Sequence, residues 1–331
     1  MERKDIWIVE ELRNPSTDYY IIPALKHLEL YERAILLREP PRNIDCKGIT
    51  LIFVRYLTGE WARFIKENRN KIKKVIYFMD DDLFDITSWK GLSIRYIKKL
   101  LFKAYRWKSF LINIKADFFV STPYLAKKYH YLDPVILPPY PIFEPSTNKE
   151  RDENISIFYF GSDSHQREKL WLYDIIYEVM RSDRQVIFEI IGNSDIYKRF
   201  KGLGRVIVIH PMKWEAYKNF LLNKKRHIGL VPFFNGKFGL AKSYIKFFEV
   251  VACGAVGIYS QNSPYERVVE GGKDGFLIPN EKDKWIEAIK LLIEDETKRD
   301  KLFTNSINKL YALKSSAEKV YEDIIKSRLE G

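Results

Sequence analysis

The chain alternates short apolar runs with longer amphipathic or polar stretches. In its first half the apolar runs lie at residues 5–9, 50–55, 73–79, 116–120 and 135–137. Runs of this length are typical of strands, and the stretches between them are long enough for helices. Strands that alternate with helices indicate a mostly parallel sheet with helices on its faces. The first half therefore predicts an α/β domain.

The same alternation resumes in the second half. Its apolar runs lie at residues 155–160, 186–191, 205–209, 228–232 and 255–259. Between the halves, residues 138–145 read PPYPIFEP, and four prolines disfavour both a helix and a central strand. We therefore expect two Rossmann-like domains facing across a cleft at the carboxyl ends of their strands. The expected boundaries are 1–145 for the first domain, 146–305 for the second and 306–331 for a last helix, which we expect to pack back on the first domain.

Composition and charge narrow the class of protein. The 331 residues are 46% hydrophobic and 30% charged, a balance that suits a folded globular protein. No apolar run approaches the roughly 20 residues of a membrane-spanning helix, and the first residues do not read as a secretory signal, so we expect a cytoplasmic protein. Cys46 and Cys253 lie far apart and away from metal-ligand spacings, which argues against a disulfide or a zinc site. A formal net charge of +12 indicates attraction to nucleic acid, an anionic membrane or phosphorylated substrates.

The segment 234–260 carries the most informative chemistry. A helix over 240–252 would place Lys242, Lys246, Glu249 and Cys253 on one face. A loop that contains Gly236 and Gly239 precedes this helix. Its backbone N–H groups and the helix N-terminus can therefore face an anion such as a diphosphate. Lys246 is then suited to neutralise a phosphate, and Glu249 to accept hydrogen bonds from ribose hydroxyls. The alternative is an exposed salt bridge between Lys246 and Glu249 within the helix.

This segment resembles the donor-nucleotide motif of GT-B glycosyltransferases of the group-1 family. The residues that carry the resemblance are Gly239, Ser243, Lys246, Glu249, Ala252, Gly254 and Val256. It continues through Ser260, Pro264, Tyr265 and residues 270–279, and extends back to residues 159–172. The resemblance implies that the second domain binds a nucleotide sugar and that the first is the acceptor side.

The resemblance also implies the donor-binding residues. Gly161, Ser162 and His165 lie in the first turn of the second domain, facing the diphosphate, and His165 is a catalytic candidate as well. His210 follows the strand 205–209 and either approaches the nucleotide or belongs to an ordinary turn. The complete donor-binding set is Gly161, Ser162, His165, His210, Gly239, Ser243, Lys246, Glu249 and Tyr265.

The chain departs from the family pattern at one position. Many retaining members carry two acidic residues with seven residues between them, and here the first of these positions is Ala241. In those members the first acid lies near the sugar. Its absence leaves open both the donor preference and whether the anomeric configuration is retained, and positive charge from Lys242 or Lys246 would then stabilise the leaving diphosphate.

Three consecutive aspartates, Asp80, Asp81 and Asp82, follow an apolar strand of the first half. At the carboxyl end of a parallel strand they would lie where such sheets bind ligands, and one of them could deprotonate an acceptor hydroxyl. The alternatives are a metal-binding acidic cluster and a simple helix N-cap. Arg55 and Tyr56 end the preceding strand and are the candidate acceptor contacts.

Residues 90–115 contain eight lysines and arginines and no acidic residue. Aromatic and aliphatic residues interleave with this charge, which predicts a basic amphipathic helix. Such a helix either binds an anionic membrane surface or is a solvated surface helix whose apolar face belongs to the core.

The predicted function is sugar transfer from a nucleotide-activated donor to a cell-surface glycan or a lipid-linked acceptor, at the inner face of the membrane. We expect neither a cofactor nor a metal ion. A transferase of CMP-activated acidic sugars is a close alternative, because lysine and histidine also suit a carboxylate on the donor. A nucleic-acid-binding protein is an alternative from another class, but no RNP, KH, zinc-finger or helix-turn-helix motif is present, so no specific nucleic acid is expected. An epimerase or phosphorylase would share the fold.

Overall fold

The computed structural model describes residues 5–42, 45–145, 154–162, 165–183, 185–234 and 236–330. The chain forms two compact units. Unit 1 comprises Met1–Ile142, Gly236–Ser243 and Lys314–Gly331, and unit 2 comprises Phe143–Asn235 and Tyr244–Leu313. The chain thus passes from the first unit to the second within the proline-rich segment.

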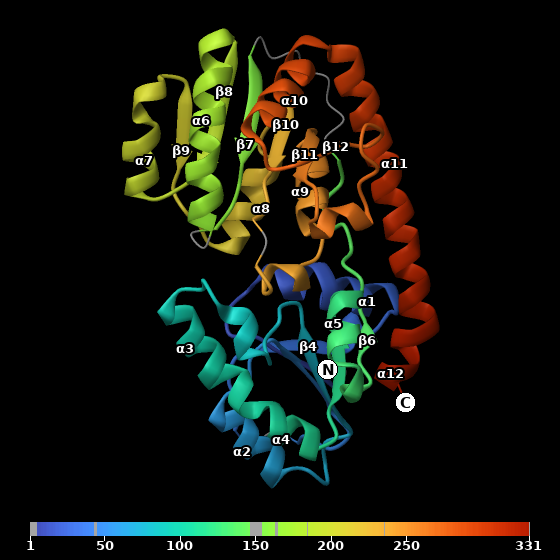
Figure 1. Cartoon of the computed structure of the whole chain (residues 1–331). Coiled ribbons are helices and arrows are strands. Elements are labelled where there is room, and N and C mark those ends of the chain that lie inside the picture. Colours follow the sequence, from blue (N-terminus) through green and yellow to red (C-terminus); the bar gives the residue numbers. More distant parts are fainter. Residues whose placement is uncertain are drawn as a thin grey trace. The chain divides into compact units, whose positions relative to one another are not determined.

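Unit 1 is built on a parallel sheet, drawn in the blue and cyan part of Figure 1. Its described strands follow the order β2-β1-β3-β4-β5-β6. They are β1 (Ile6–Val9), β2 (Ala34–Leu37), β3 (Thr50–Val54), β4 (Lys74–Met79), β5 (Asp117–Val120) and β6 (Val135–Ile136). The predicted strands are confirmed, and β2 is an additional edge strand that the sequence analysis missed.

The helices of unit 1 begin at polar caps where the sequence offers them. Thr58, Ser93 and Thr122 each accept a backbone N–H at a helix start. The α-helices are α1 (Ile22–His27), α2 (Gly59–Glu67), α3 (Ile94–Lys103), α4 (Lys108–Asn113), α5 (Pro123–Lys128) and α12 (Lys326–Glu330). Tighter or wider turns are η1 (Thr17–Ile21), η2 (Tyr31–Arg33), η3 (Ile86–Trp89), η4 (Tyr105–Trp107), η5 (His130–Leu132), η8 (Gly239–Ala241) and η10 (Tyr321–Ile325).

The expectation of one basic helix over residues 90–115 is wrong in detail. Three elements, α3, η4 and α4, occupy this stretch instead. Ala104 interrupts the helical path, since its backbone leaves the helical region at φ −130° and ψ −69°. The chain therefore changes direction between α3 and α4.

Unit 2 contains a second parallel sheet with the described strand order β12-β11-β10-β7-β8-β9. Its strands are β7 (Ile155–Tyr159), β8 (Val186–Ile191), β9 (Val206–Ile209), β10 (Ile228–Val231), β11 (Val256–Ser260) and β12 (Phe276–Ile278). Its helices are α6 (Gln166–Ser182), α7 (Ser194–Phe200), α8 (Trp214–Leu222), α9 (Ile245–Ala252), α10 (Lys282–Glu294) and the start of α11 (Glu296–Val320), with the turns η7 (Lys201–Leu203) and η9 (Pro264–Arg267).

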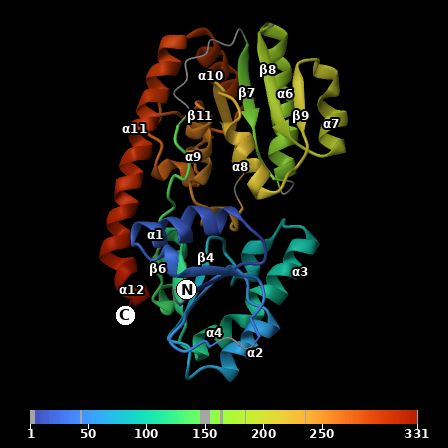
Figure 2. The ribbon, with the colours of Figure 1, turned by 180° about the vertical axis from the view of Figure 1, so that it is seen from behind.

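Close packing in unit 2 depends on aromatic rings and on two glycines. Helices α6 and α10 lie side by side (Figures 1 and 2), and the ring of Trp171 meets that of Trp285 edge to face at 5.2 Å. A side chain at Gly257 would lie 2.2 Å from the ring of Tyr259, and one at Gly229 would lie 2.7 Å from Val250. Glycine at these two strand positions lets neighbouring groups cover the sheet closely.

The sequence also predicted that the chain has no membrane-spanning helix and no disulfide. Across the part of the chain that the structure describes, no helix combines the length and the apolar character needed to cross a membrane. Cys46 and Cys253 are both buried and unbridged. Burial raises the pKa of the Cys253 thiol to about 12, which makes it an inert core residue.

Candidate functional site

The carboxyl ends of β7, β10 and β11 meet at one edge of the unit 2 sheet, because these strands are parallel neighbours. The turn after β7 leads into α6, the chain after β10 leads to α9, and β11 is followed by η9. Most residues predicted to bind the donor are found in these turns. Parallel α/β sheets bind ligands at this edge.

A cluster of three side chains occupies the start of α9 and the facing helix α8. The carboxylate oxygen Oε2 of Glu249 accepts hydrogen bonds from the Tyr217 hydroxyl at 2.7 Å and from Lys246 Nζ at 2.5 Å. Lys246 Nζ also lies 3.2 Å from the Tyr217 hydroxyl oxygen. The Lys246–Glu249 salt bridge that the sequence left open therefore exists, but its Glu249 side chain is buried rather than exposed. Tyr217 was missed in the sequence analysis.

Part of this cluster remains able to bind a ligand. The hydrogen bonds from Tyr217 and Lys246 both go to Oε2 of Glu249, and Oε1 accepts none from the described residues. The side chain of Lys246 is 35% exposed. The cluster thus offers one carboxylate oxygen as an acceptor and one ammonium group as a donor.

Tyr265, in η9, is affected by charges both of this cluster and of the start of α6. Burial raises the pKa of its phenol, and the nearby Glu249 and Glu168 carboxylates raise it further. Glu168 in turn lies 3.3 Å from His165 Nδ1. His165 stands at the N-cap position of α6. Glu249, paired with Lys246, and Glu168, beside His165, therefore both lie near enough to Tyr265 to act on its phenol.

The first turn itself requires a glycine. A side chain at Gly161 would lie 2.5 Å from the hydroxyl of Tyr159, a buried residue at the end of β7. Ser162, the next residue, is exposed. At Gly161 the backbone therefore lies close to the Tyr159 side chain at the end of β7, and residues 163–164 of this turn lie outside the described part.

Two predicted donor residues occupy a different unit from Glu249. Helix α9 begins at Ile245, so the expectation of a helix from residue 240 is wrong. Gly239, Lys242 and Ser243 precede the helix and belong to the segment 236–243, which packs within unit 1. Lys242 therefore does not share a helical face with Lys246. His210 is exposed and follows β9, the last strand in the sheet order, two strands away from β7.

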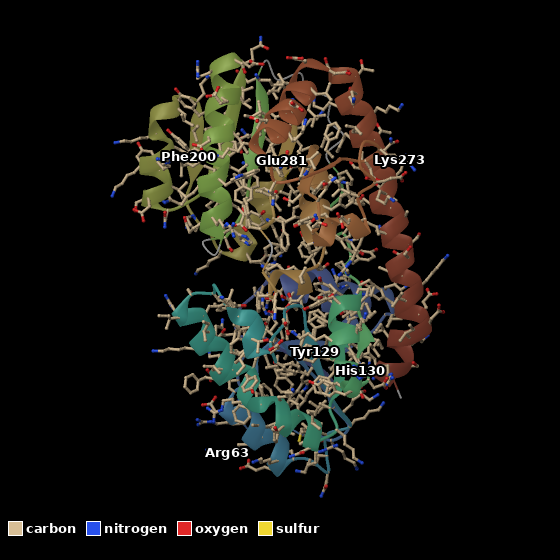
Figure 3. All side chains as sticks on the ribbon, in the orientation of Figure 1. Arg63, Tyr129, His130, Phe200, Lys273 and Glu281 are labelled. Atoms are coloured by element: carbon tan, nitrogen blue, oxygen red, sulfur yellow. The ribbon has the colours of Figure 1, made fainter. Side chains whose placement is uncertain are left out.

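The three aspartates after β4 have three different environments. The Asp82 side chain is completely buried, where it accepts hydrogen bonds from the Tyr129 hydroxyl and, at 2.6 Å, from Lys128 Nζ. Figure 3 labels Tyr129, at the end of α5. Both oxygens of Asp82 are therefore occupied away from solvent, which favours a structural role for it over the predicted catalytic one.

Asp80 and Asp81 share the guanidinium of Arg55. Arg55 Nε lies 3.2 Å from Asp80 Oδ1, and Arg55 Nη2 donates to Asp81 and, at 2.7 Å, to the Tyr96 hydroxyl. Ser16 Oγ donates to Asp80 Oδ2 at 2.5 Å. Burial raises the pKa of Asp81, against the lowering effect of Arg55 and of Lys242. Although burial opposes the charge, Asp80 and Asp81 hold the pKa of Arg55 well above its ordinary value.

Arg55 is consequently a partner of the two aspartates. Its Nε and Nη2 groups already face Asp80, Asp81 and the Tyr96 hydroxyl, so a direct contact of Arg55 with an acceptor stays a prediction. Tyr56 lies beneath two cations, at 5.5 Å from the Arg55 guanidinium and 4.4 Å from Lys99 Nζ, measured to its ring centroid.

A second polar cluster, after β1, was missed in the sequence analysis. Glu10 is buried and accepts hydrogen bonds from Thr17 Oγ1 at 2.5 Å and Asn14 Nδ2 at 2.9 Å. Arg13 bridges Glu10 and Asp18. Burial raises the pKa of Glu10 despite these partners. Since β1, β3 and β4 are parallel neighbours, this cluster lies at the same sheet edge as Asp80 and Asp81.

These arrangements suit anion binding in unit 2 and proton transfer in unit 1. The first offers an ammonium group, an imidazole and a glycine turn, and the second offers carboxylates of which two, Glu10 and Asp81, have a raised pKa. Within the described residues, no three histidine, cysteine or acidic side chains are grouped so as to hold a metal ion.

No protein-family model and no curated protein matches the chain. Several solved structures, however, are similar to the chain in fold although their sequences are very different. HepE from Anabaena, solved with UDP and glucose, is similar with a TM-score of 0.63 over 97% of this chain and 99% of that one, at 11% identity. Sucrose-phosphate synthase from Thermosynechococcus elongatus gives 0.62 over 99% and 100%, at 13% identity. The pneumococcal O-GlcNAc transferase GtfA, with UDP and GlcNAc, gives 0.61 over 86% and 58%, at 14% identity.

Structural similarity at such low sequence identity shows the fold that these proteins share. Two six-stranded parallel sheets in the described residues, each flanked by helices, match these structures over nearly the full length of two of them. The chain therefore has the α/β fold of the GT-B class, built from two Rossmann-like units.

Proposed function

We propose that this protein is a glycosyltransferase that uses a nucleotide-activated sugar, with the nucleotide bound by unit 2. The observation that carries the proposal is the cluster of Lys246, Glu249 and Tyr217 at the carboxyl edge of the unit 2 sheet. It stands in a fold shared with HepE, which was solved with UDP and glucose. The group-1 resemblance of the segment around Glu249 supports the same assignment.

The nucleotide would use the groups that the cluster leaves available. Glu249 Oε1 is suited to accept a hydrogen bond from a ribose hydroxyl. Lys246 and the turn from Gly161 to the start of α6 are suited to a diphosphate, because they combine a cation with backbone N–H groups at a helix N-terminus. Charge stabilisation of the departing diphosphate is then the main catalytic contribution of unit 2. His165, beside Glu168, is the residue we propose to contact a phosphate oxygen.

A donor with a neutral sugar fits this site better than one with an acidic sugar. Glu168 and Glu249 both act on the Tyr265 phenol, so two carboxylates already lie in this region. A third carboxylate, carried by the sugar, would be repelled by them. The CMP-activated acidic sugar therefore becomes the second choice.

The acceptor base belongs to unit 1. We propose that Asp81, or Asp80 beside it, receives the proton of the acceptor hydroxyl. A raised pKa makes a carboxylate a better proton acceptor, and burial raises that of Asp81. Arg55 would hold the aspartate pair in place. The proposed acceptor is a glycan or a lipid-linked glycan on the cytoplasmic side of a membrane.

A panel of ligands tests the proposal through thermal stability. A ligand that binds only the folded protein raises its melting temperature. We expect an increase with a nucleoside diphosphate and with its neutral nucleotide sugar, and a smaller one or none with CMP. Alanine at Lys246 or Glu249 should abolish the increase.

Two other outcomes would change the assignment. Stabilisation by CMP alone would move the donor to the acidic-sugar class. Stabilisation by single-stranded RNA, with no response to any nucleotide or nucleotide sugar, would contradict the proposal and favour a nucleic-acid-binding protein.

A further inference from the structure

We propose that the outer face of α3, together with η4 and α4, docks this protein onto an anionic lipid bilayer. We call this face the α3 surface and define it by residues that point away from the unit 1 core. It consists of Lys90, Ile94, Arg95, Lys98, Phe102, Tyr105, Arg106, Lys108, Ile112 and Lys115.

Helical spacing explains how α3 presents two faces. Ile94, Lys98 and Phe102 follow one another every four residues and form a single exposed stripe. Ile94 is 74% exposed and Phe102 is 61% exposed. Leu100, on the opposite side, is completely buried in the unit 1 core. The exposed stripe is therefore a second, outward apolar face that the core does not use.

The apolar stripe continues beyond α3 and is surrounded by positive charge. Tyr105 is 36% exposed and Ile112 is 41% exposed. Residues 86–116 contain no acidic side chain at all. Lys99 and Lys103 both pair with Glu11, which lies outside this stretch. The remaining six basic residues form no ion pair with any described residue, so their charge is available to a partner.

A bilayer accounts for both properties together. Exposed large aliphatic and aromatic side chains beside unpaired cations are the pattern of a helix that lies in the plane of a membrane interface. Lysine and arginine bind anionic headgroups, while Ile94 and Phe102 are long enough to enter the acyl boundary. A nucleic acid would neutralise the cations but would leave the aliphatic Ile94 and Ile112 in water.

The inner face of α3 connects this surface with the aspartates of unit 1. Tyr96 donates to Asp81 and accepts from Arg55, and Lys99 lies over the Tyr56 ring. A helix with its side chains is about 10 Å across. A membrane against the α3 surface would thus lie about one helix diameter from Asp81, within reach of a lipid-linked acceptor. This connection rests on the proposed function, whereas membrane binding itself does not.

Co-sedimentation with vesicles tests the inference on the full chain. The probes are vesicles of phosphatidylcholine with phosphatidylglycerol and vesicles of phosphatidylcholine alone. We expect binding to the first that weakens with added salt, and little binding to the second. The double variants Ile94→Ser with Phe102→Ser, and Arg95→Gln with Lys98→Gln, should each weaken binding about tenfold or more, because each removes one of the two contributions.

Matched changes elsewhere serve as controls. Tyr197→Ser removes an exposed aromatic ring from α7, and Lys198→Gln with Lys201→Gln removes two exposed cations near the same helix. These variants should bind vesicles as the unchanged protein does. Nucleotide-induced stabilisation should be the same in every variant, since none alters the unit 2 cluster, so a failure of the donor assignment would be seen separately.

Three results would overturn the inference. One is the absence of binding to anionic vesicles. Another is binding that survives both α3 double variants. The third is a preference for single-stranded RNA over anionic vesicles that depends on Arg95 and Lys98 but not on Ile94 and Phe102.

Discussion

Identical neighbouring residues can have unlike roles, as the three aspartates after β4 show. Asp82 is fixed by Lys128 and Tyr129, Asp81 by Arg55 and Tyr96, and Asp80 by Ser16 and Arg55. The sequence placed all three at the end of a strand, and this is where they lie. It could not separate their roles, because the deciding partners of Asp82 come from α5, some 46 residues away.

Asp82 should stabilise unit 1. Asp82→Asn leaves Lys128 without its buried carboxylate and should lower the free energy of unfolding by about 2 kcal/mol, as expected for a lost hydrogen bond to a charged group. Asp133→Asn is the control: Asp133 is 91% exposed, its positive φ of 46° suits asparagine, and its pairing with Arg328 is worth little. Urea denaturation of both variants measures the difference, and equal stability would refute a structural role for Asp82.

Asp85 should give a pH dependence of known sign. Burial opposes ionisation, but hydrogen bonds from Lys128 and Thr87 lower the pKa of Asp85 to about 2, below its ordinary 3.8. A carboxyl whose pKa is depressed on folding stabilises the protein above its unfolded pKa and loses that contribution as the pH falls through the folded one. Asp85→Asn should therefore cost about 1 kcal/mol near neutral pH, and this cost should shrink as the pH falls from about 4 through 2. Denaturant titrations across this range would show a constant difference if the depressed pKa is wrong.

At the scale of elements, the segment 236–243 departs most from the sequence analysis. It joins β10 to α9 of unit 2, yet its Phe238 and Ala241 are part of the unit 1 core. Thr122 Oγ1 donates to the Ala241 carbonyl, and the Phe238 ring meets Tyr96 edge to face at 6.1 Å. The glycine-rich composition correctly predicted a loop before a helix. Which unit the loop packs on depends on tertiary partners that are distant in the chain.

Phe238 should accordingly stabilise unit 1. Phe238→Ala empties a buried position and should cost about 3 kcal/mol. Leu240→Ala, two residues away and 38% exposed, should change stability by less than about 0.5 kcal/mol. Chemical denaturation of the two variants provides the comparison, and similar losses for both would contradict the packing of Phe238 in the core.

The local sequence pattern predicted the end of helix α9 but not its start. Its predicted end at residue 252 is confirmed, and Gly254, two residues later, has the positive φ of 75° that a helix-terminating glycine adopts. Its start was placed five residues too early, because residues 240–244 continue the helical spacing. The contacts of Ala241 with unit 1 determine the actual start at Ile245.

At the scale of the molecule, the alternation of apolar runs and amphipathic stretches was enough to predict the fold. Ten of the strands arise from apolar runs of clear length, and all of these but β6 and β9 contain buried residues. The two strands that were not predicted, β2 and β12, are edge strands without a buried residue, but the same is true of β6 and β9, which were predicted. An edge position therefore weakens the apolar pattern in some strands but does not by itself explain which strands the sequence reveals.

The central claim is that unit 2 binds a nucleotide through Lys246 and Glu249. Isothermal titration calorimetry with the nucleoside diphosphate that stabilises the protein measures this directly. We predict one site per chain and a Kd about tenfold or more weaker in Glu249→Gln and in Lys246→Met, as expected when a hydrogen bond to a charged group is lost. Glu287→Gln, which removes the charge of another Lys–Glu pair with the same spacing on α10, should leave the Kd unchanged. Equal affinity in all of these variants, or no binding of any nucleotide to the folded protein, would contradict the account.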